Sequence, residues 1–325
     1  MAVASPDLAA ESISWLPQRR RFTFLRDLAR RKIAVIGIVY LAVFYSAGIF
    51  APWLAPQDPN KQELSVQART QGPSSEHYLG TDALGRDLAS RIMYSARTTI
   101  IFTVVVVLGG SLFIGLGLGL LAGYRGGWVD TTILRVGEVL GGIPTLILML
   151  AVSAAFRSRI SDLSFWLREH TWLGADAKTI VSFAIIIAVT VPFSWVGSAR
   201  IVRGQALSIR ERDYITAAEA IGCSTWRVVW YHLFPGVLPL WLVGVSGGMA
   251  AIALTEVGLT FLGLGIVPPT ASFGSLINEG TGIRAFESHP HLLLASAIPV
   301  ILFSYAWNMI GDALVDLVQP KQQRR

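Results

Sequence analysis

The sequence predicts an all-α, polytopic membrane protein with six transmembrane helices. Of its 325 residues, 53% are hydrophobic and only 15% are charged, and the mean hydropathy is +0.54. A soluble globular chain carries about 25% charged residues, and a helix needs about 20 apolar residues to cross a bilayer. Seven stretches without Asp, Glu, Lys or Arg come near or exceed that length: 33–57, 98–124, 139–156, 179–199, 228–255, 257–278 and 288–311.

One of the seven stretches is not expected to span the membrane. The stretch 257–278 contains four glycines and two prolines: Gly258, Gly263, Gly265, Gly274, Pro268 and Pro269. Such breaks leave backbone groups unpaired, which is not tolerated against lipid. We therefore expect the end of a helix followed by an outer re-entrant or surface loop. The six predicted spans are 33–54, 98–123, 133–155, 179–203, 236–258 and 290–314.

The distribution of basic residues predicts the orientation of the spans. Seven Lys and Arg residues lie within 19–32, just before the first span, and five Arg residues lie within 200–227. By the positive-inside rule both segments are cytoplasmic. Six spans then return the C-terminus to the cytoplasm. We expect a cytoplasmic basic segment over 1–32, a first transmembrane helix and extracytoplasmic loop over 33–97, and a cytoplasmic tail over 318–325, in the plasma (inner) membrane of a prokaryote.

We attribute most of the net charge of +6 to the basic residues that orient the chain in the membrane. Nucleic-acid binding would require a basic surface with groove-reading or stacking groups, and none is evident in the sequence.

The sequence also predicts the structure of two loops. In the outer loop, Thr81 or Asp82 is predicted to cap a short helix in which Leu84, Leu88 and Ile92 share one face. The segment 156–178 is predicted to be a loop of mixed charge whose tryptophans lie at the membrane interface.

The sequence offers no catalytic or cofactor chemistry of its own. There is no G-x-x-x-x-G-K-[ST] motif for binding nucleotide phosphates and no G-x-S-x-G or H-E-x-x-H motif. Only His289 and His291 are close together, and no Cys or carboxylate pair completes a metal-ligand set around them. Cys223 is the one cysteine, so no internal disulfide forms. We therefore expect a non-enzymatic chain that binds neither metal nor cofactor.

Ionisable residues within spans mark candidate pathway or gating positions. Glu138 is placed near the cytoplasmic start of the third span, followed by two glycines and Pro144, and Glu256 is placed near the outer end of the fifth. The alternative for both residues is a helix-end carboxylate that lies in water or pairs with an Arg, such as Arg135 beside Glu138. The pattern favours neither interpretation.

Small residues recur in two of the predicted spans and favour close helix packing. They are Gly109, Gly110, Gly115, Gly117, Gly119 and Gly123 in the second span, and Gly244, Gly247 and Gly248 in the fifth.

The polar segment "TAAEAIGCSTWRVVWYHLFP", residues 216–235, lies between the fourth and fifth spans. Asp213 is predicted to cap a short helix over 214–221, and Gly222 fits the left-handed position that ends a helix. Ser224 is predicted to cap a second helix that leads to Pro235. This helix-turn-helix on the cytoplasmic face is either a docking element or a self-packed loop, and the pattern alone supports both equally.

The same segment resembles the cytoplasmic "EAA" loop of ABC-importer permeases, E-A-A-x3-G-x9-I-x-L-P. Ala217, Ala218, Gly222 and Pro235 keep their spacing, whereas Thr216 stands in place of the first Glu. Four more segments resemble, in family order, the C-type permease subunits of dipeptide, oligopeptide and nickel importers. They are "HYLGTDALGRDLASRIMYSART", "RVGEVLGGIPTLIL", "TEVGLTFLGLGIVPPTASFGSLINEG" and "NMIGDALVDLVQP", and the resemblance covers about residues 20–320.

The resemblance implies the transmembrane domain of a type I ABC importer, with a permease domain over 98–317 and a coupling loop over 204–235. It implies a heterodimer with a second permease, two cytoplasmic ATPase subunits that bind ATP-Mg, and an extracytoplasmic binding protein. Ala217, Ala218 and Gly222 would sit in a groove of the ATPase. The complete set of coupling residues is Arg212, Asp213, Thr216, Ala217, Ala218, Glu219, Gly222 and Pro235.

Three alternatives to a peptide permease stay open. Relatives of this architecture carry nickel, opines or sugars, and the shared motifs do not name the cargo. A secondary transporter would show inverted repeats and functional charges at the membrane midplane, and neither is visible. A structural or assembly protein of the membrane would have no coupled ATPase activity.

Overall fold

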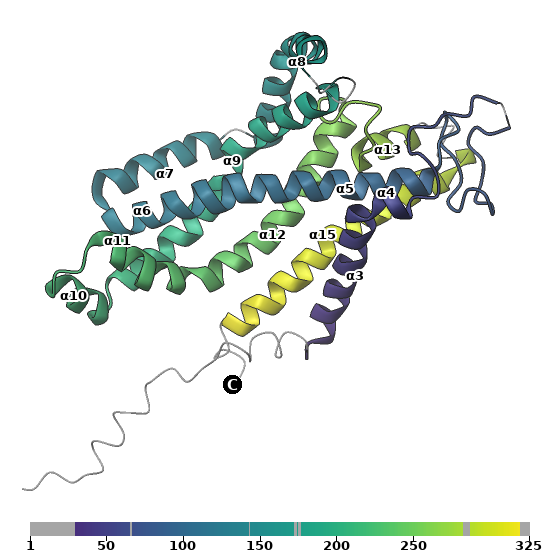
Figure 1. The fold of residues 1–325 in the computed structure, drawn as a ribbon. Coiled ribbons are helices and arrows are strands. Elements are labelled where there is room, and N and C mark those ends of the chain that lie inside the picture. Colours follow the sequence, from purple (N-terminus) through teal and green to yellow (C-terminus); the bar gives the residue numbers. More distant parts are fainter. Residues whose placement is uncertain are drawn as a thin grey trace, which may run out of the picture.

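The protein is helical throughout its regular structure. The computed structural model describes residues 30–65, 67–142, 144–171, 174, 177–281 and 287–318, and the named elements in these ranges are all helices (Figure 1). Five helices are long and apolar enough to cross a membrane, or six if one bent pair forms a single span. The prediction of an all-α polytopic protein is confirmed. The expectations for 1–29 and 319–325 lie outside the described residues.

The first two predicted spans are present, and the second is longer than expected. Helix α3 (Lys32–Ile49) is followed by the short α4 (Ala51–Leu54). Helix α5 (Leu88–Val106) continues through a π-helix, η1 (Val107–Leu116), into α6 (Gly117–Arg125). The side chain of Asp87 caps α5 by accepting a hydrogen bond from the backbone N–H of Ser90 at 2.8 Å.

The predicted short helix in the outer loop is therefore wrong. Neither Thr81 nor Asp82 caps a helix, because the Oδ1 atom of Asp82 accepts the backbone N–H groups of Leu84 and Arg86 in a tight turn. Leu84 lies in that turn, whereas Leu88 and Ile92 are both helical and belong to α5.

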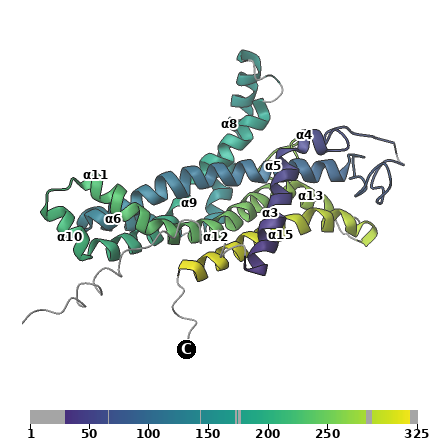
Figure 2. The ribbon, with the colours of Figure 1, turned by 60° about the horizontal axis from the view of Figure 1, so that its bottom comes forward.

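The predicted third span is broken into two helices. Helix α7 (Gly127–Gly141) and helix α8 (Thr145–His170) are bent by 79° where they meet. Pro144 occupies the N-cap position of α8, and its ring prevents a continuous helix through this point. Helix α8 runs on to His170, so the predicted loop 156–178 is wrong over most of its length. Both views show α8 projecting away from the other helices (Figures 1 and 2).

The remaining elements follow the predicted order. They are α9 (Ala177–Arg210), α10 (Asp213–Ala220), α11 (Thr225–Val228), the π-helix η3 (Val229–Leu233), α12 (Phe234–Phe261), α13 (Phe273–Gly280) and α15 (Pro290–Val318). The second span (α5, η1 and α6), α9 and α12 run between two ends of the molecule. Helices α10 and α11 lie at one end, which we call the α10 end, and α13 and α4 lie at the other, the α13 end (Figure 1). The stretch 257–278 contains the end of α12 and a loop, as predicted, and then most of the short helix α13, which was not predicted.

Glycines let the second span lie directly against α9. A Cβ atom added to Gly119 would lie 2.7 Å from Cβ of Val202, and one added to Gly123 would lie 2.5 Å from Cβ of Ala206. Such distances are well inside van der Waals contact, so the close-packing prediction is confirmed at these two positions. Gly117 faces no atom within 4 Å, and its role is not close packing.

Aromatic rings hold α13 against the first and last spans. The rings of Phe44 in α3 and Phe303 in α15 have centroids 4.7 Å apart, and the ring of Phe273 in α13 stacks on Phe44 at 6.0 Å. Such pairs stabilise by more than the area they bury. The α13 end is therefore a packed cap rather than a loose loop.

Candidate functional site

Helix α10 and the turn behind it are defined by backbone hydrogen bonds. Gly222 has φ +82° and donates to Glu219 O at 2.9 Å, while Cys223 N–H donates to Ala218 O at 3.0 Å. This pair of bonds is the Schellman motif, in which the residue after the C-cap is left-handed. The prediction that Gly222 takes the left-handed position that ends a helix is confirmed. Because no heavy atom lies within 4 Å of its missing Cβ, its conformation rather than its size is what the turn requires.

Two capping predictions need correction. Arg212, not Asp213, is the N-cap of α10, and Asp213 is the first helical residue. There its negative charge still faces the positive end of the helix dipole. Ser224 does occupy the N-cap of α11, but its side chain makes no capping hydrogen bond.

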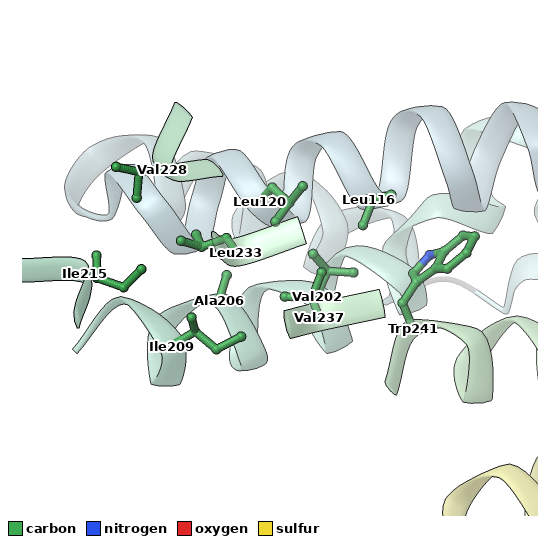
Figure 3. Packing of buried hydrophobic residues seen from close by; sticks show 10 residues of the cluster. All are labelled: Leu116, Leu120, Val202, Ala206, Ile209, Ile215, Val228, Leu233, Val237 and Trp241. Atoms are coloured by element: carbon green, nitrogen blue, oxygen red, sulfur yellow. The ribbon is translucent and has the colours of Figure 1, made fainter. Parts of the chain in front are cut away.

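The α10–α11 unit is anchored by a buried apolar cluster. Ile215 of α10, Val228 of α11 and Leu233 of η3 are all buried, and they pack with side chains of α6, α9 and α12 (Figure 3). The other members are Leu116, Leu120, Val202, Ala206, Ile209, Val237 and Trp241. Isolated helices shorter than about 12 residues are marginal in water. This cluster therefore supplies the rigidity that an eight-residue helix lacks by itself.

Polar contacts add to this anchorage. The Tyr124 hydroxyl, at the end of α6, donates to Glu219 Oε1 at 2.9 Å. The guanidinium of Arg210 lies over the Tyr124 ring, 5.9 Å from its centroid, which is a cation–π geometry. Two turns further into α9, Arg203 Nη2 donates to Asp130 Oδ2 of α7 at 2.6 Å. These contacts connect the end of α6 to α10 and to the end of α9, and they connect the start of α7 to α9.

The outward face of the unit is apolar at its tip. Ile221 is 82% exposed and Trp226 is 71% exposed, and Thr216, Ala217 and Gly222 are also exposed. Ala218 is only 8% exposed because it faces the chain's own core. Of the small residues in the loop, Ala217 and Gly222 are thus available to a partner and Ala218 is not. Glu219 is exposed but already bound to Tyr124.

The candidate pathway residues do not meet. Glu138 lies in the last turn of α7, about 16 Å along that helix from its first residue, rather than at the start of a span. It is exposed, and among the described residues it forms no ion pair with Arg135. Pro144 is exposed at the break between α7 and α8.

Glu256 is completely buried in α12. Its carboxylate accepts hydrogen bonds from Thr260 Oγ1 at 3.0 Å and from Thr99 Oγ1 of α5 at 3.4 Å. Thr260 Oγ1 in turn accepts the backbone N–H of Ile266 at 3.1 Å. Glu256 therefore joins α12 to α5 and to the loop that follows α12. This places it in the packing of the α13 end rather than on an open surface.

A buried ionic cluster at the α13 end was not predicted from the sequence. Arg86 and Arg91 each contact both Asp82 and Glu279, with Arg86 Nε at 2.6 Å from Asp82 Oδ2 and Arg91 Nη1 at 2.7 Å from Glu279 Oε2. The two arginine side chains are almost fully buried. The cluster joins the start of α5 to α13. Sequence spacing shows the Asp82–Arg86 pair, but Glu279 lies 188 residues beyond Arg91 and carries no local signal.

No group of three or more His, Cys, Asp and Glu residues is arranged to hold a metal ion within the described ranges. The rings of His289 and His291 contact each other at 5.9 Å between centroids.

Comparisons with known proteins agree with this architecture. Residues 115–324 match the family described as "Binding-protein-dependent transport system inner membrane component". Residues 22–73 match the family described as "N-terminal TM domain of oligopeptide transport permease C". The first match includes the whole of α9, α10, α11 and α12, and thus the helix-turn-helix described above.

Curated relatives resemble the chain over almost its full length. The dipeptide transport system permease protein of Bacillus subtilis is 34% identical, over 92% of this chain and 85% of that protein. The glutathione transport system permease protein of Pectobacterium atrosepticum is 31% identical over 92% and 90%. The oligopeptide transport system permease protein of Mycobacterium bovis is 30% identical over 93% and 94%. The chain therefore belongs to the family of binding-protein-dependent transport system inner membrane components, the permease subunits of ABC importers.

Proposed function

We propose that this permease subunit forms half of the pathway by which di- and oligopeptides cross the plasma membrane. The cargo is supported by relatives whose names specify dipeptide, oligopeptide and glutathione transport. The same architecture carrying nickel or another small solute is the alternative within the family. A secondary transporter is not favoured, because the matched family depends on a binding protein.

The α10–α11 unit is the proposed coupling site. The observation that supports this role is a rigid helix-turn-helix with an exposed apolar tip, Ile221 and Trp226, fixed to the ends of α6, α9 and α12. An exposed apolar patch on an anchored element is typical of a protein interface. Displacement of such a unit moves three spans together, whereas a flexible loop would change its own conformation without moving the spans.

The proposed assembly contains four kinds of subunit. A second, related permease completes the pathway, two cytoplasmic ATPase subunits bind ATP-Mg and contact the coupling loop 204–235, and an extracytoplasmic binding protein delivers cargo at the α13 end. In this arrangement both termini and the α10 end are cytoplasmic. The permease chain itself binds no cofactor and catalyses no reaction, and ATP hydrolysis belongs to the partner subunits.

The coupling role is tested in proteoliposomes that contain the permease pair, the ATPases and the binding protein. Gly222→Arg places a long side chain at the left-handed turn and is expected to abolish peptide-stimulated ATP hydrolysis. Gly127→Arg is the matched control, since Gly127 also has a positive φ, +56°, and no atom within 4 Å of its missing Cβ, but it is the first residue of α7 and lies outside the α10–α11 unit.

Full stimulation in the Gly222→Arg complex would refute the coupling role. Peptide uptake that continues after ATP depletion would refute the importer mechanism as a whole.

A further inference from the structure

A cavity of about 150 Å³ lies where η1, α9 and α12 pass one another. Its lining includes Ser111 of η1, Gly197 of α9 and Gly248 of α12. Each of these residues lies about 20 Å along its helix from the α10 end. Trp241, which belongs to the apolar cluster in Figure 3, forms part of the wall. The cavity is therefore inside the membrane-spanning part of the chain.

Two hydrogen bonds join the three walls of the cavity. Trp241 Nε1 of α12 donates to Ser198 Oγ of α9 at 2.8 Å, and Ser198 Oγ donates to the backbone carbonyl oxygen of Ser111 at 3.0 Å. Helix η1 also packs directly on α9, because a Cβ atom added to Gly115 would lie 2.7 Å from Cβ of Ser198. The cavity thus lies beside a tight, hydrogen-bonded contact and does not result from loose helix packing.

The side chain of Ser111 is a polar group without a partner in this cavity. The residue is 8% exposed, and its hydroxyl forms no hydrogen bond with a described residue. The hydroxyl oxygens of Ser95 and Ser153 also lack a partner but have no accessible surface, whereas the Ser111 oxygen keeps some. A buried hydroxyl without a hydrogen bond is unfavourable. Because Ser111 lines the cavity and its oxygen is accessible, it indicates a polar occupant rather than a lipid chain.

Two positions in the walls expose backbone without a side chain. No heavy atom lies within 4 Å of the Cβ position at Gly197 or Gly248, so the close-packing prediction is wrong for Gly248 within this chain. Gly119 and Gly123, in contrast, do face α9 at close range. Glycine allows another backbone to approach closely. Gly197 is exposed, so the cavity is accessible from the surface of α9.

The wall that carries Ser111 has an unusual backbone. Helix η1 is π-helical over ten residues, Val107–Leu116. Segments of this kind are rare, are mostly single turns within α-helices, and frequently occur at functional sites. The accessible hydroxyl, the open glycines and the π-helix are independent observations, and all three meet at this cavity.

We propose that this cavity is part of the translocation pathway, in which the main chain of a passing peptide lies against Gly197 and Gly248 and bonds to the Ser111 hydroxyl. The proposal rests on the proposed peptide cargo and names residues that the cargo contacts. A typical ligand site has about 300–1,000 Å³. The smaller volume here fits a chain that supplies half of a pathway. Contacts to the main chain tolerate any side-chain sequence, which suits a carrier of varied short peptides.

The first test measures uptake of tri-alanine by the complete complex in proteoliposomes. The side chain added in Gly248→Val enters open space, so it fills the cavity without a clash inside the chain. We expect the initial rate of uptake to fall about tenfold or more, because overpacking of an occupied site costs at least that factor. Gly247→Val is the matched control. Its neighbouring position also faces no atom within 4 Å but does not line the cavity, and uptake is expected to stay unchanged.

A second variant tests the hydroxyl. Ser111→Ala removes no hydrogen bond from the described part of the chain, so the thermal unfolding temperature is expected to stay unchanged. Uptake of tri-alanine is expected to slow by about two- to tenfold, the factor that corresponds to one lost hydrogen bond to the peptide. A purely structural role of Ser111 would change the unfolding temperature as well.

Unchanged uptake in Gly248→Val or in Ser111→Ala would overturn the proposal, and so would an equal loss in Gly247→Val. A wild-type complex that does not take up tri-alanine at all would instead refute the peptide cargo.

A labelling measurement keeps the test independent of the uptake rate. In a Cys223→Ser background, Gly248→Cys is reacted with a water-soluble, membrane-impermeant thiol reagent in lipid nanodiscs, which leave both faces of the complex accessible. We expect labelling that slows during turnover with saturating tri-alanine, binding protein and ATP, and no such slowing at Gly247→Cys. Labelling of Gly248→Cys by a lipid-soluble reagent alone would mean that lipid fills the cavity. No labelling by either reagent would mean that the second permease closes it permanently, and both results would overturn the proposal.

Discussion

Replacing Gly222 by alanine is expected to loosen the turn between α10 and α11 without any steric clash. The residue has φ +82°, and no heavy atom lies within 4 Å of the position that a Cβ would take. The added methyl group therefore meets open space, and the whole cost is conformational. For a residue with a side chain the left-handed region costs about 1–2 kcal/mol.

The expected magnitude follows from the bonds that depend on this turn. The Schellman pair, from Gly222 N–H to Glu219 O and from Cys223 N–H to Ala218 O, forms only while residue 222 is left-handed. A penalty of 1–2 kcal/mol on that state raises the population of the opened turn by a factor of about 5–30. Amide hydrogen exchange over 216–223 should accelerate by the same factor, because exchange reports local opening.

The assay is hydrogen exchange with mass spectrometry on the complete complex. Gly222→Asn is expected to give a smaller effect, since Asn tolerates the left-handed region better than Ala. Gly204→Ala is the matched control, because Gly204 also faces no atom within 4 Å but lies inside helix α9 with an ordinary φ. There alanine is expected to be neutral or stabilising by up to about 1 kcal/mol.

Unchanged exchange over 216–223 in Gly222→Ala would show that the turn does not depend on this residue. An equal acceleration in Gly204→Ala would show that the effect is not specific to the left-handed conformation. Either result would refute the reasoning that the turn sets the rigidity of the α10–α11 unit.

Three further predictions concern the packing around the two ends, and each is measured by thermal unfolding in one detergent. Gly119→Ala is expected to lower the free energy of unfolding by about 1–3 kcal/mol, because the new Cβ would overlap α9. Gly117→Ala is the control, since its Cβ meets no atom, and it should be neutral or stabilising. Equal effects of the two variants would contradict the close packing of these helices. Arg91→Met leaves Arg86 as the one cation against the two carboxylates of Asp82 and Glu279, so one negative charge of the cluster loses its partner. This should cost about 3–5 kcal/mol, against less than about 0.5 kcal/mol for the exposed Arg97→Met; a mild loss in Arg91→Met would mean that the cluster is not structural. Tyr124→Phe removes the hydroxyl that donates to α10 and should cost about 0.5–1.5 kcal/mol, with faster exchange in α10 and no change in α13.

The α10–α11 unit shows which features the local sequence pattern predicts. Gly222, the short α10 and the second helix behind it were predicted from capping and turn chemistry, and the structure contains all three. The error of one residue at the N-cap arises because Asp213 can serve either as a cap or as a first-turn acid, and both roles satisfy the same helix end. Which face of α10 is buried was not predictable from its small residues, because Ala217 and Ala218 are identical in chemistry and differ only in direction.

Errors in the third span have a different origin. The break at Pro144 follows a pair of glycines, so the local signal was present, but hydropathy alone treats the stretch as continuous. The extension of α8 to His170 was missed because its charged residues resemble a loop, while their intrinsic helix propensity is high.

The sequence by itself determined the class of the molecule: apolar stretches of bilayer length, and a helix-turn-helix between the fourth and fifth spans. These properties depend on residues within one or two helical turns of each other, and their physical causes are transfer to lipid and local hydrogen bonding. Only the tertiary structure decided that Glu279 meets Arg86 and Arg91, that Ala218 faces inward, and that Ser111, Gly197 and Gly248 line one cavity. Those outcomes depend on how long helices pack, and packing brings together side chains that no local pattern relates.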